Sequence, residues 1–307
     1  MKKRRLILLA LALIAASVIT ILLWPGEREP EYQGKKLSEW LLGYRSARAQ
    51  SEQAEAANAV RQIGTNAIPW LVEWISCDDE LPAWRLRLFH WASEHRRIAK
   101  GKMFRSLVHI PEMDKILAGC HGFEILGPAA KDAVPELSHI MHGPMLYGKA
   151  RRAVLALSKI GNHALPVLLS ALSNESQTNR YWIAWCIGNM RDLGTNVDST
   201  VPALVQCIKG KDKELGGAAA EALGKLHPTP DLAIPALKLA SHDSDNYLRH
   251  PALMALGQFG AQARSAIPDL LEAANDPDAG IRYAATYALN KIAPELLPPE
   301  DRHGELE

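Results

Sequence analysis

Residues 245–275 read DNYLRHPALMALGQFGAQARSAIPDLLEAAN, and this stretch decides the fold. Leu248 and Leu256 belong to an apolar stripe at helical spacing, and Gly260 then ends the helix because glycine readily adopts the left-handed conformation of a C-cap. Pro268 follows in the first turn of a second helix, where its missing N–H has no intrahelical partner. The stretch therefore predicts two helices joined by a short turn.

The same pattern recurs along the chain at nearly fixed intervals. Prolines in this setting are spaced by 66, 31, 36, 33 and 33 residues, and the first gap equals two periods. They are Pro69, Pro135, Pro166, Pro202, Pro235 and Pro268. The glycines expected to end the preceding helices are Gly64, Gly127, Gly161, Gly224 and Gly260. Such a period of paired helices indicates a solenoid, whose core forms only when repeats stack, here through small Ala and Gly residues.

Charged residues recur at the start of each repeat. Three acid or amide residues precede an arginine by six positions: Asp276 and Arg282, Asp243 and Arg249, Asn174 and Arg180. With the run Arg282–Leu289, these residues resemble the HEAT-repeat superfamily, including its shorter bacterial form, over roughly residues 45–295. In that family the Asp and the Arg tend to pair across adjacent repeats, and Gly216 interrupts the series in this chain.

We predict an all-α fold, a right-handed α-α solenoid of about seven HEAT-like helical hairpins preceded by one transmembrane helix. The expected divisions are a signal-anchor transmembrane helix at 1–24, a polar linker at 25–36, the solenoid at 37–295 with a divergent part at 81–110, and a flexible tail at 296–307. Leu37, Trp40 and Leu41 are expected to cover the open apolar end of the first repeat. No sheet is expected beyond the anchor.

The N-terminus has the features of a membrane anchor. Four basic residues, Lys2 to Arg5, precede the 19 uncharged residues Leu6–Trp24. A helix of that length spans about 28 Å and crosses a bilayer once. The basic leader favours a cytoplasmic N-terminus, which places the repeats outside the cytoplasm at a bacterial inner membrane. A cleaved signal peptide is the alternative, since Ala15–Ser17 offers small residues, but the apolar run continues past them.

Charge and composition limit the kinds of partner that the chain can bind. Beyond Trp24 the chain carries 31 Lys and Arg against 34 Asp and Glu, a formal net charge of −3, so no nucleic-acid partner is expected. Positive charge gathers only at 84–105, beside aromatic residues. The favoured interpretation of this basic segment is a divergent repeat with a solvated basic face. The alternative is a binding site for an anionic ligand or partner. Its predicted contact residues are Arg85, Arg87, Arg96, Arg97, Lys100 and Arg105.

No sequence motif indicates catalysis. The chain has no Gly-x-Ser-x-Gly elbow, Walker loop, dinucleotide fingerprint or His-Glu-x-x-His, and we expect no catalytic residue, cofactor or metal. His139 and His142 lie three residues apart, as metal ligands on a helix would, but surface histidines are the favoured interpretation. Buried thiols are favoured over a disulfide between Cys186 and Cys207. The other two cysteines are Cys77 and Cys120.

The sequence thus predicts a membrane-anchored HEAT-repeat scaffold that binds protein or peptide partners in the cell envelope. Three other classes stay open. The first is a HEAT-like enzyme or enzyme accessory with a site dispersed over several repeats, and the second is a soluble nucleic-acid-binding solenoid if Leu6–Trp24 is misread. A purely structural spacer is the remaining interpretation.

Overall fold

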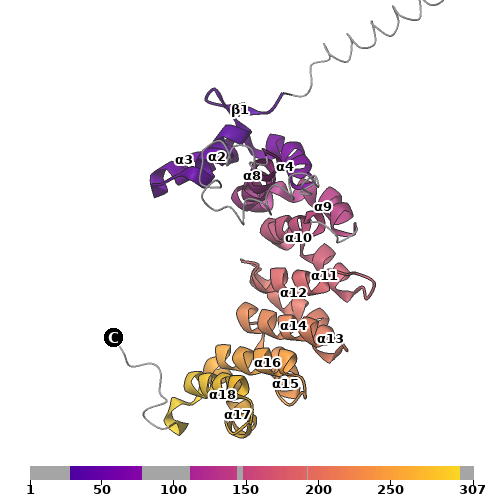
Figure 1. The fold of residues 1–307 in the computed structure, drawn as a ribbon, viewed down its shortest axis with the longest axis vertical. Coiled ribbons are helices and arrows are strands. Elements are labelled where there is room, and N and C mark those ends of the chain that lie inside the picture. Colours follow the sequence, from indigo (N-terminus) through magenta and orange to yellow (C-terminus); the bar gives the residue numbers. More distant parts are fainter. Residues whose placement is uncertain (1–27, 78–110, 144–147, 192, 298–307) are drawn as a thin grey trace, which may run out of the picture.

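The computed structural model describes residues 28–77, 111–143, 148–191 and 193–297. Its helices stack into an elongated, curved array that runs from indigo at the N-terminal end to yellow at the C-terminal end (Figure 1). One apolar core follows the array from Leu37 to Leu297. The prediction of a helical solenoid is confirmed.

Six helical hairpins can be followed in the described residues, each with a first helix A and a second helix B. In chain order they are α3 (Gln50–Ile63) with α4 (Ile68–Ile75), α8 (Pro111–Leu126) with α9 (Val134–Met141), α10 (Lys149–Ile160) with α11 (Leu165–Ser173), α12 (Arg180–Gly188) with α13 (Val201–Lys209), α14 (Lys213–Leu226) with α15 (Pro230–Ala240), and α16 (Asn246–Gln258) with α17 (Ile267–Ala273). The array begins with α2 (Leu37–Ser46) and ends with α18 (Ala279–Ile292). The 3-10 turns between these helices are η1 (Gly64–Ala67), η2 (Gly127–Ala133), η3 (Gly161–His163), η4 (Gly194–Thr200) and η5 (Gly260–Ala266), and η6 (Pro294–Leu296) follows α18.

A small β-hairpin precedes the first helix, and here the expectation of no sheet is wrong. Strands β1 (Glu31–Tyr32) and β2 (Lys35–Lys36) pair antiparallel, within the range predicted to be a linker. Gln33 and Gly34 both have positive φ, as the type I′ turn of a two-residue hairpin requires. The Trp40 indole donates to the carbonyl of Tyr32 at 3.1 Å, which ties the hairpin to α2.

Helix α2 covers the N-terminal end of the core, as predicted. Leu37, Trp40 and Leu41 are all buried. The Glu29 carboxylate accepts hydrogen bonds from the backbone N–H and the hydroxyl of Ser38 at the start of the helix. A negative charge is stabilised there by the unpaired N–H groups of the first turn. Helix α2 is thus held in place by Glu29, which precedes the β-hairpin, and by Trp40, which follows it.

The repeat prolines occupy the first turn of their helices in five hairpins, as expected. The exception is Pro235, which lies inside α15 because this helix already begins at Pro230. The expectation that Gly224 ends the preceding helix is also wrong. Helix α14 continues to Leu226 and ends at His227, which takes the left-handed conformation instead. Gly64, Gly127, Gly161 and Gly260 do have the positive φ expected of them.

Small residues allow the A helices to pack closely, as predicted. A Cβ on Gly224 would lie 2.9 Å from both Cα and Cβ of Ala255 in α16. Carbon atoms prefer separations of about 3.5–4.0 Å, so only a residue without a side chain fits at this contact. Gly188 meets Ala222 of α14 in the same way. These contacts set the spacing between successive repeats.

The segment predicted to be a divergent repeat, 81–110, lies outside the described residues. The hairpins that precede and follow it in sequence nevertheless contact each other directly. Gly119 and Gly122 of α8 face Ile75 and Leu71 of α4 so closely that a Cβ would overlap their side chains. Arg152 of α10 also donates to the carbonyl of Ile75 at 2.8 Å.

The predicted anchor Leu6–Trp24 lies outside the described residues as well. Among the helices between 28 and 297 that the structure describes, none has the length and apolar character needed to cross a membrane. Of the predicted tail, Leu297 is buried in the core, and 298–307 lies outside the described range.

Candidate functional site

The basic segment does not enter the site, because its six predicted contact residues lie within 78–110, which the structure does not describe. The partner-binding assignment of Arg85, Arg87, Arg96, Arg97, Lys100 and Arg105 stays a prediction. The candidate site described below comes instead from the regular repeats between α10 and α14.

Ion pairs join successive repeats near the start of the A helices. Arg249 of α16 pairs with Asp276 of the next repeat, and the exposed fractions of these two side chains are 19% and 15%. One repeat earlier, Lys213 Nζ lies 2.7 Å from Asp243 Oδ2. The hydrogen bond from Lys213 lowers the pKa of Asp243, while partial burial opposes that shift. The predicted pairing of Arg and Asp across repeats is therefore confirmed at Arg249.

Two glycines break this series in the repeat that begins at α14. Asp243 and Asp276 each lie eight residues after a repeat proline, and the same place after Pro202 is Gly210. Gly216 occupies the position of Arg249 in this repeat. Lys213 replaces the missing arginine and supplies a cation to Asp243. No carboxylate replaces the missing aspartate, because Arg180 of the preceding repeat pairs with none among the described residues.

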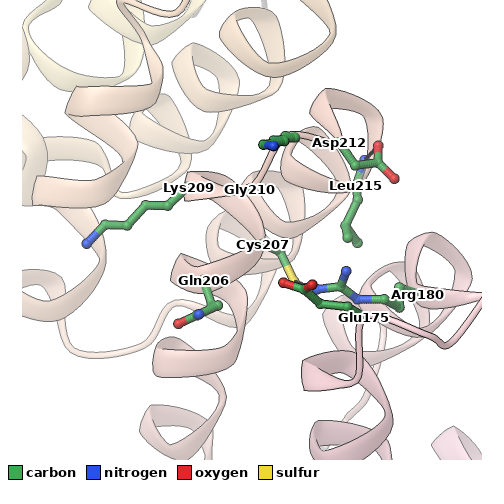
Figure 2. A pocket seen from close by; sticks show the side chains of 9 residues that line it. Glu175, Arg180, Gln206, Cys207, Lys209, Gly210, Asp212 and Leu215 are labelled. Atoms are coloured by element: carbon green, nitrogen blue, oxygen red, sulfur yellow. Dashed lines mark hydrogen bonds between the residues drawn. The ribbon is translucent and has the colours of Figure 1, made fainter.

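A cavity of about 740 Å³ lies at this break, between the start of α12 and the end of α13 (Figure 2). We call it the Arg180 pocket. Its wall consists of Arg180, Gln206, Cys207, Gly210, Asp212 and Leu215. Glu175, Lys209 and Lys211 complete it, and Figure 2 shows the Lys209 side chain directed away from Arg180.

The Arg180 side chain is held at one edge only. Its Nε donates to the carbonyl of Leu172 at 2.7 Å, and one terminal nitrogen, Nη2, lies 3.9 Å from the sulfur of Cys207. The other terminal nitrogen, Nη1, has no hydrogen-bond partner among the described residues. Burial raises the pKa of the Cys207 thiol, and the positive charge of Arg180 opposes this rise. At neutral pH the thiol is therefore neutral and leaves the guanidinium charge uncompensated.

The acidic residues of the pocket do not supply that compensation. Asp212 accepts from the backbone N–H of Leu215 at 3.0 Å and so caps α14. Glu175 lines the wall without forming an ion pair with Arg180. The pocket thus presents a half-buried guanidinium to solvent beside an apolar wall at Leu215.

A second feature lies on helices α10, α12 and α14. The indole rings of Trp182 and Trp185 stack at 4.6 Å between centroids, with 9° between their planes. The guanidinium carbon of Arg151 lies 4.3 Å from the Trp182 ring centroid, and Lys225 Nζ lies 5.9 Å from that of Trp185. We call these four residues the tryptophan column. A cation over each outer ring face is attracted by the negative charge there.

The tryptophan column was not predicted from the sequence. The sequence signal that could have revealed it is the spacing of Trp182 and Trp185, which lie three residues apart on one helix. The residues at these two positions in other repeats are mostly smaller. Both indoles are only half buried, and the neighbouring Tyr181 is 50% exposed. Tyr247 and Tyr283 on later A helices are exposed by 68% and 63%. Aromatic side chains therefore recur on the outer surface of the A helices.

The remaining candidates from the sequence have ordinary surroundings. Cys186 and Cys207 are buried free thiols, as predicted. Burial raises the pKa of Cys186 to about 12. The His142 ring nitrogen Nδ1 lies 2.6 Å from the carbonyl of Ser138 in its own helix, and His139 is exposed. Within the described ranges, no group of three or more His, Cys, Asp or Glu side chains is placed to hold a metal.

Comparison with known proteins identifies the repeats. A family described as HEAT repeats matches residues 165–257 and 234–299, and the PBS lyase HEAT-like repeat matches residues 149–174. The chain is a HEAT-repeat superfamily protein. No curated protein matches this HEAT-repeat chain. A solved structure titled as an engineered protein is 19% identical to this chain, with a TM-score of 0.40, and the match covers 83% of this chain and 95% of the engineered protein.

Proposed function

We propose that this HEAT-repeat protein is a scaffold whose outer helix faces bind protein or peptide partners in the cell envelope. Stacked repeats offer a long surface without needing a deep active site. The tryptophan column is the observation that supports this proposal most directly. Trp, Tyr and Arg are the residues most enriched among those that dominate binding energy at protein interfaces.

The column is also built to bind with little loss of freedom. The two stacked indoles hold each other, and Trp182 Nε1 donates to the carbonyl of Arg151 at 3.1 Å. Lys225 is fixed in turn by Glu221 at 2.6 Å. Ordering flexible side chains at an interface costs about 0.5–1.5 kcal/mol each, so groups that are already ordered bind more favourably. Tyr181, half exposed beside the column, extends the aromatic surface.

Crosslinking in the native membrane tests this proposal. Trp185→Ala should lose crosslinked partners, because it removes an anchor from the centre of the surface. Met254→Ala is the matched control, since Met254 lies at the same helix position two repeats later and is also half buried. Both variants should keep the helical signal of the parent in far-UV circular dichroism. Retention of the same partners by both variants would show that the column is only an inter-repeat contact.

For localisation we propose a single-pass inner-membrane protein anchored by Leu6–Trp24, with the repeats outside the cytoplasm. The support is the basic leader and the length of the apolar run. Protease added to the outer side of intact inner membranes should then degrade the repeats. Protection until the membrane is dissolved would place the repeats in the cytoplasm. A mature N-terminus near Ser17 or Glu27 would reveal a cleaved signal peptide instead of an anchor.

A further inference from the structure

We propose that the Arg180 pocket binds the carboxylate of an Asp or Glu side chain in an extended partner segment. This carboxylate would take the place that Asp243 and Asp276 occupy in the neighbouring repeats. The inference rests on the scaffold function proposed above and assigns it a specific contact. It follows from the two glycines of one repeat, of which only Gly216 is compensated within the chain.

The equivalent pair shows which chemistry the position accepts. Arg249 and Asp276 form an ion pair from one repeat to the next, with both side chains mostly buried. At the break, Arg180 supplies the same cation and Gly210 supplies no side chain. A carboxylate accepts hydrogen bonds from two guanidinium nitrogens in one plane, which matches the edge of Arg180 that carries Nη1 and Nη2.

Charge around the pocket favours one carboxylate over a more highly charged anion. Glu175 and Asp212 line the wall, so a second negative charge on the ligand would be repelled. Lys209 and Lys211 also line the pocket and balance the charge of these two acids, which leaves the guanidinium as the excess charge. A phosphate dianion is therefore disfavoured relative to an Asp or Glu side chain.

The cavity is large enough to admit a peptide segment. At about 740 Å³ it has room for several residues of an extended chain, and pockets for small ligands span about 300–1,000 Å³. Leu215 offers an apolar contact, and the Gln206 amide can pair with a peptide backbone. The acidic side chain would fix the register of the segment at Arg180, while its neighbours fill the remaining space.

The first test restores the missing aspartate. Gly210→Asp should place a carboxylate beside Arg180 and raise the melting temperature of the full chain above that of Gly210→Ala by roughly 2 °C. Gly210→Ala is the matched control, because any Cβ at this position lies 3.1 Å from the carbonyl of Cys207. The φ of Gly210 is −70°, so neither variant strains the backbone. The gain should vanish when Arg180→Gln is added.

The second test measures binding with a defined probe. N-acetyl-aspartate N-methylamide is titrated into the full chain while the Arg180 Nε–H signal is followed by NMR. We expect a saturable shift in the parent and in Gly210→Ala, and none in Gly210→Asp or with the asparagine analogue. Salt should weaken binding, since the attraction is between charges. Absence of a saturable shift in the parent would overturn the assignment of a carboxylate site.

Crosslinking separates this inference from the proposed function. Gly210→Asp should lose partners that Gly210→Ala retains. If Gly210→Asp keeps every partner that requires Trp185, the scaffold function stands and the assignment of the pocket to a partner segment falls. If the probe binds Arg180 while neither Gly210→Asp nor Trp185→Ala changes the crosslinked partners, the assignment to a peptide falls together with the proposed function.

Discussion

Replacing Gly224 by alanine should destabilise the array, although alanine is the better helix former. Gly224 lies inside α14, where Gly→Ala alone would gain up to about 1 kcal/mol. The added Cβ would however lie 2.9 Å from Cα and Cβ of Ala255, about 0.6 Å inside the closest comfortable carbon–carbon distance. Overpacking of this kind costs about 1–3 kcal/mol. The expected net change is a loss of up to about 2 kcal/mol.

Gly43 provides the matched control for this substitution. It lies in α2, it is exposed, and a Cβ there would meet no atom within 4 Å. Gly43→Ala should therefore stabilise the protein by about 0.5–1 kcal/mol. Urea unfolding of the full chain, followed by far-UV circular dichroism, should move the two midpoints in opposite directions. Stabilisation by both substitutions would show that α14 and α16 are not in the close contact described here.

Asparagine at position 224 distinguishes close packing from the helix end that the sequence suggested. Asparagine tolerates the left-handed conformation of a C-cap better than alanine does. If Gly224 ended the helix, Gly224→Asn would be the milder change. Since the constraint is the distance to Ala255, the larger side chain should cost more than alanine, and the reverse order would refute the reasoning.

Three further predictions follow from the core and from the ion pairs between repeats. Leu256→Asp places an unpaired carboxylate in the core and should cost several kcal/mol in urea unfolding; a variant that unfolds like the parent would mean that the assigned register is wrong. Cys186 should resist iodoacetamide at pH 8 until the chain is unfolded, and because burial raises its pKa to about 12, stability should fall as pH rises from about 9 to 12; rapid native alkylation would contradict its burial. In Lys213→Met, the loss of stability below about pH 4 should be smaller than in the parent, because the pKa of Asp243 is lowered chiefly by Lys213. An unchanged dependence of stability on acid pH would argue against the ion pair of Lys213 and Asp243.

The period of the sequence was enough to predict the paired helices and their order. Proline in a first helical turn and glycine with positive φ are local constraints, so a single sequence can reveal them, as at Pro268 and Gly260. The prediction for Gly224 was wrong because the sequence does not distinguish a glycine that permits close packing from one that ends a helix. Only the distance to Ala255, in another repeat, separates the two roles.

The candidate site was less accessible to sequence analysis. The missing arginine at Gly216 was visible in the sequence period. That Lys213 supplies the cation instead was not visible, because Lys213 lies three residues away from the expected position. The tryptophan column joins three helices, so the stacking of Trp182 on Trp185 and the cations over them depend on how the repeats pack. A contact between repeats has no local signature in the chain.

The arginines of the inter-repeat series have two tasks, hydrogen bonding to backbone carbonyls of the preceding segment and pairing with an aspartate of the next repeat. Arg282 of α18 performs the first task, because it donates to the carbonyls of Asp276 and Pro277. Arg180 keeps that structural task through its Nε bond to Leu172, which holds the stem in place. Because one edge of the guanidinium is already fixed, a carboxylate that binds the other edge need not order a mobile side chain, as it would with Lys209. The loss of one aspartate at Gly210 thus converts a structural cation into one that is positioned for a partner.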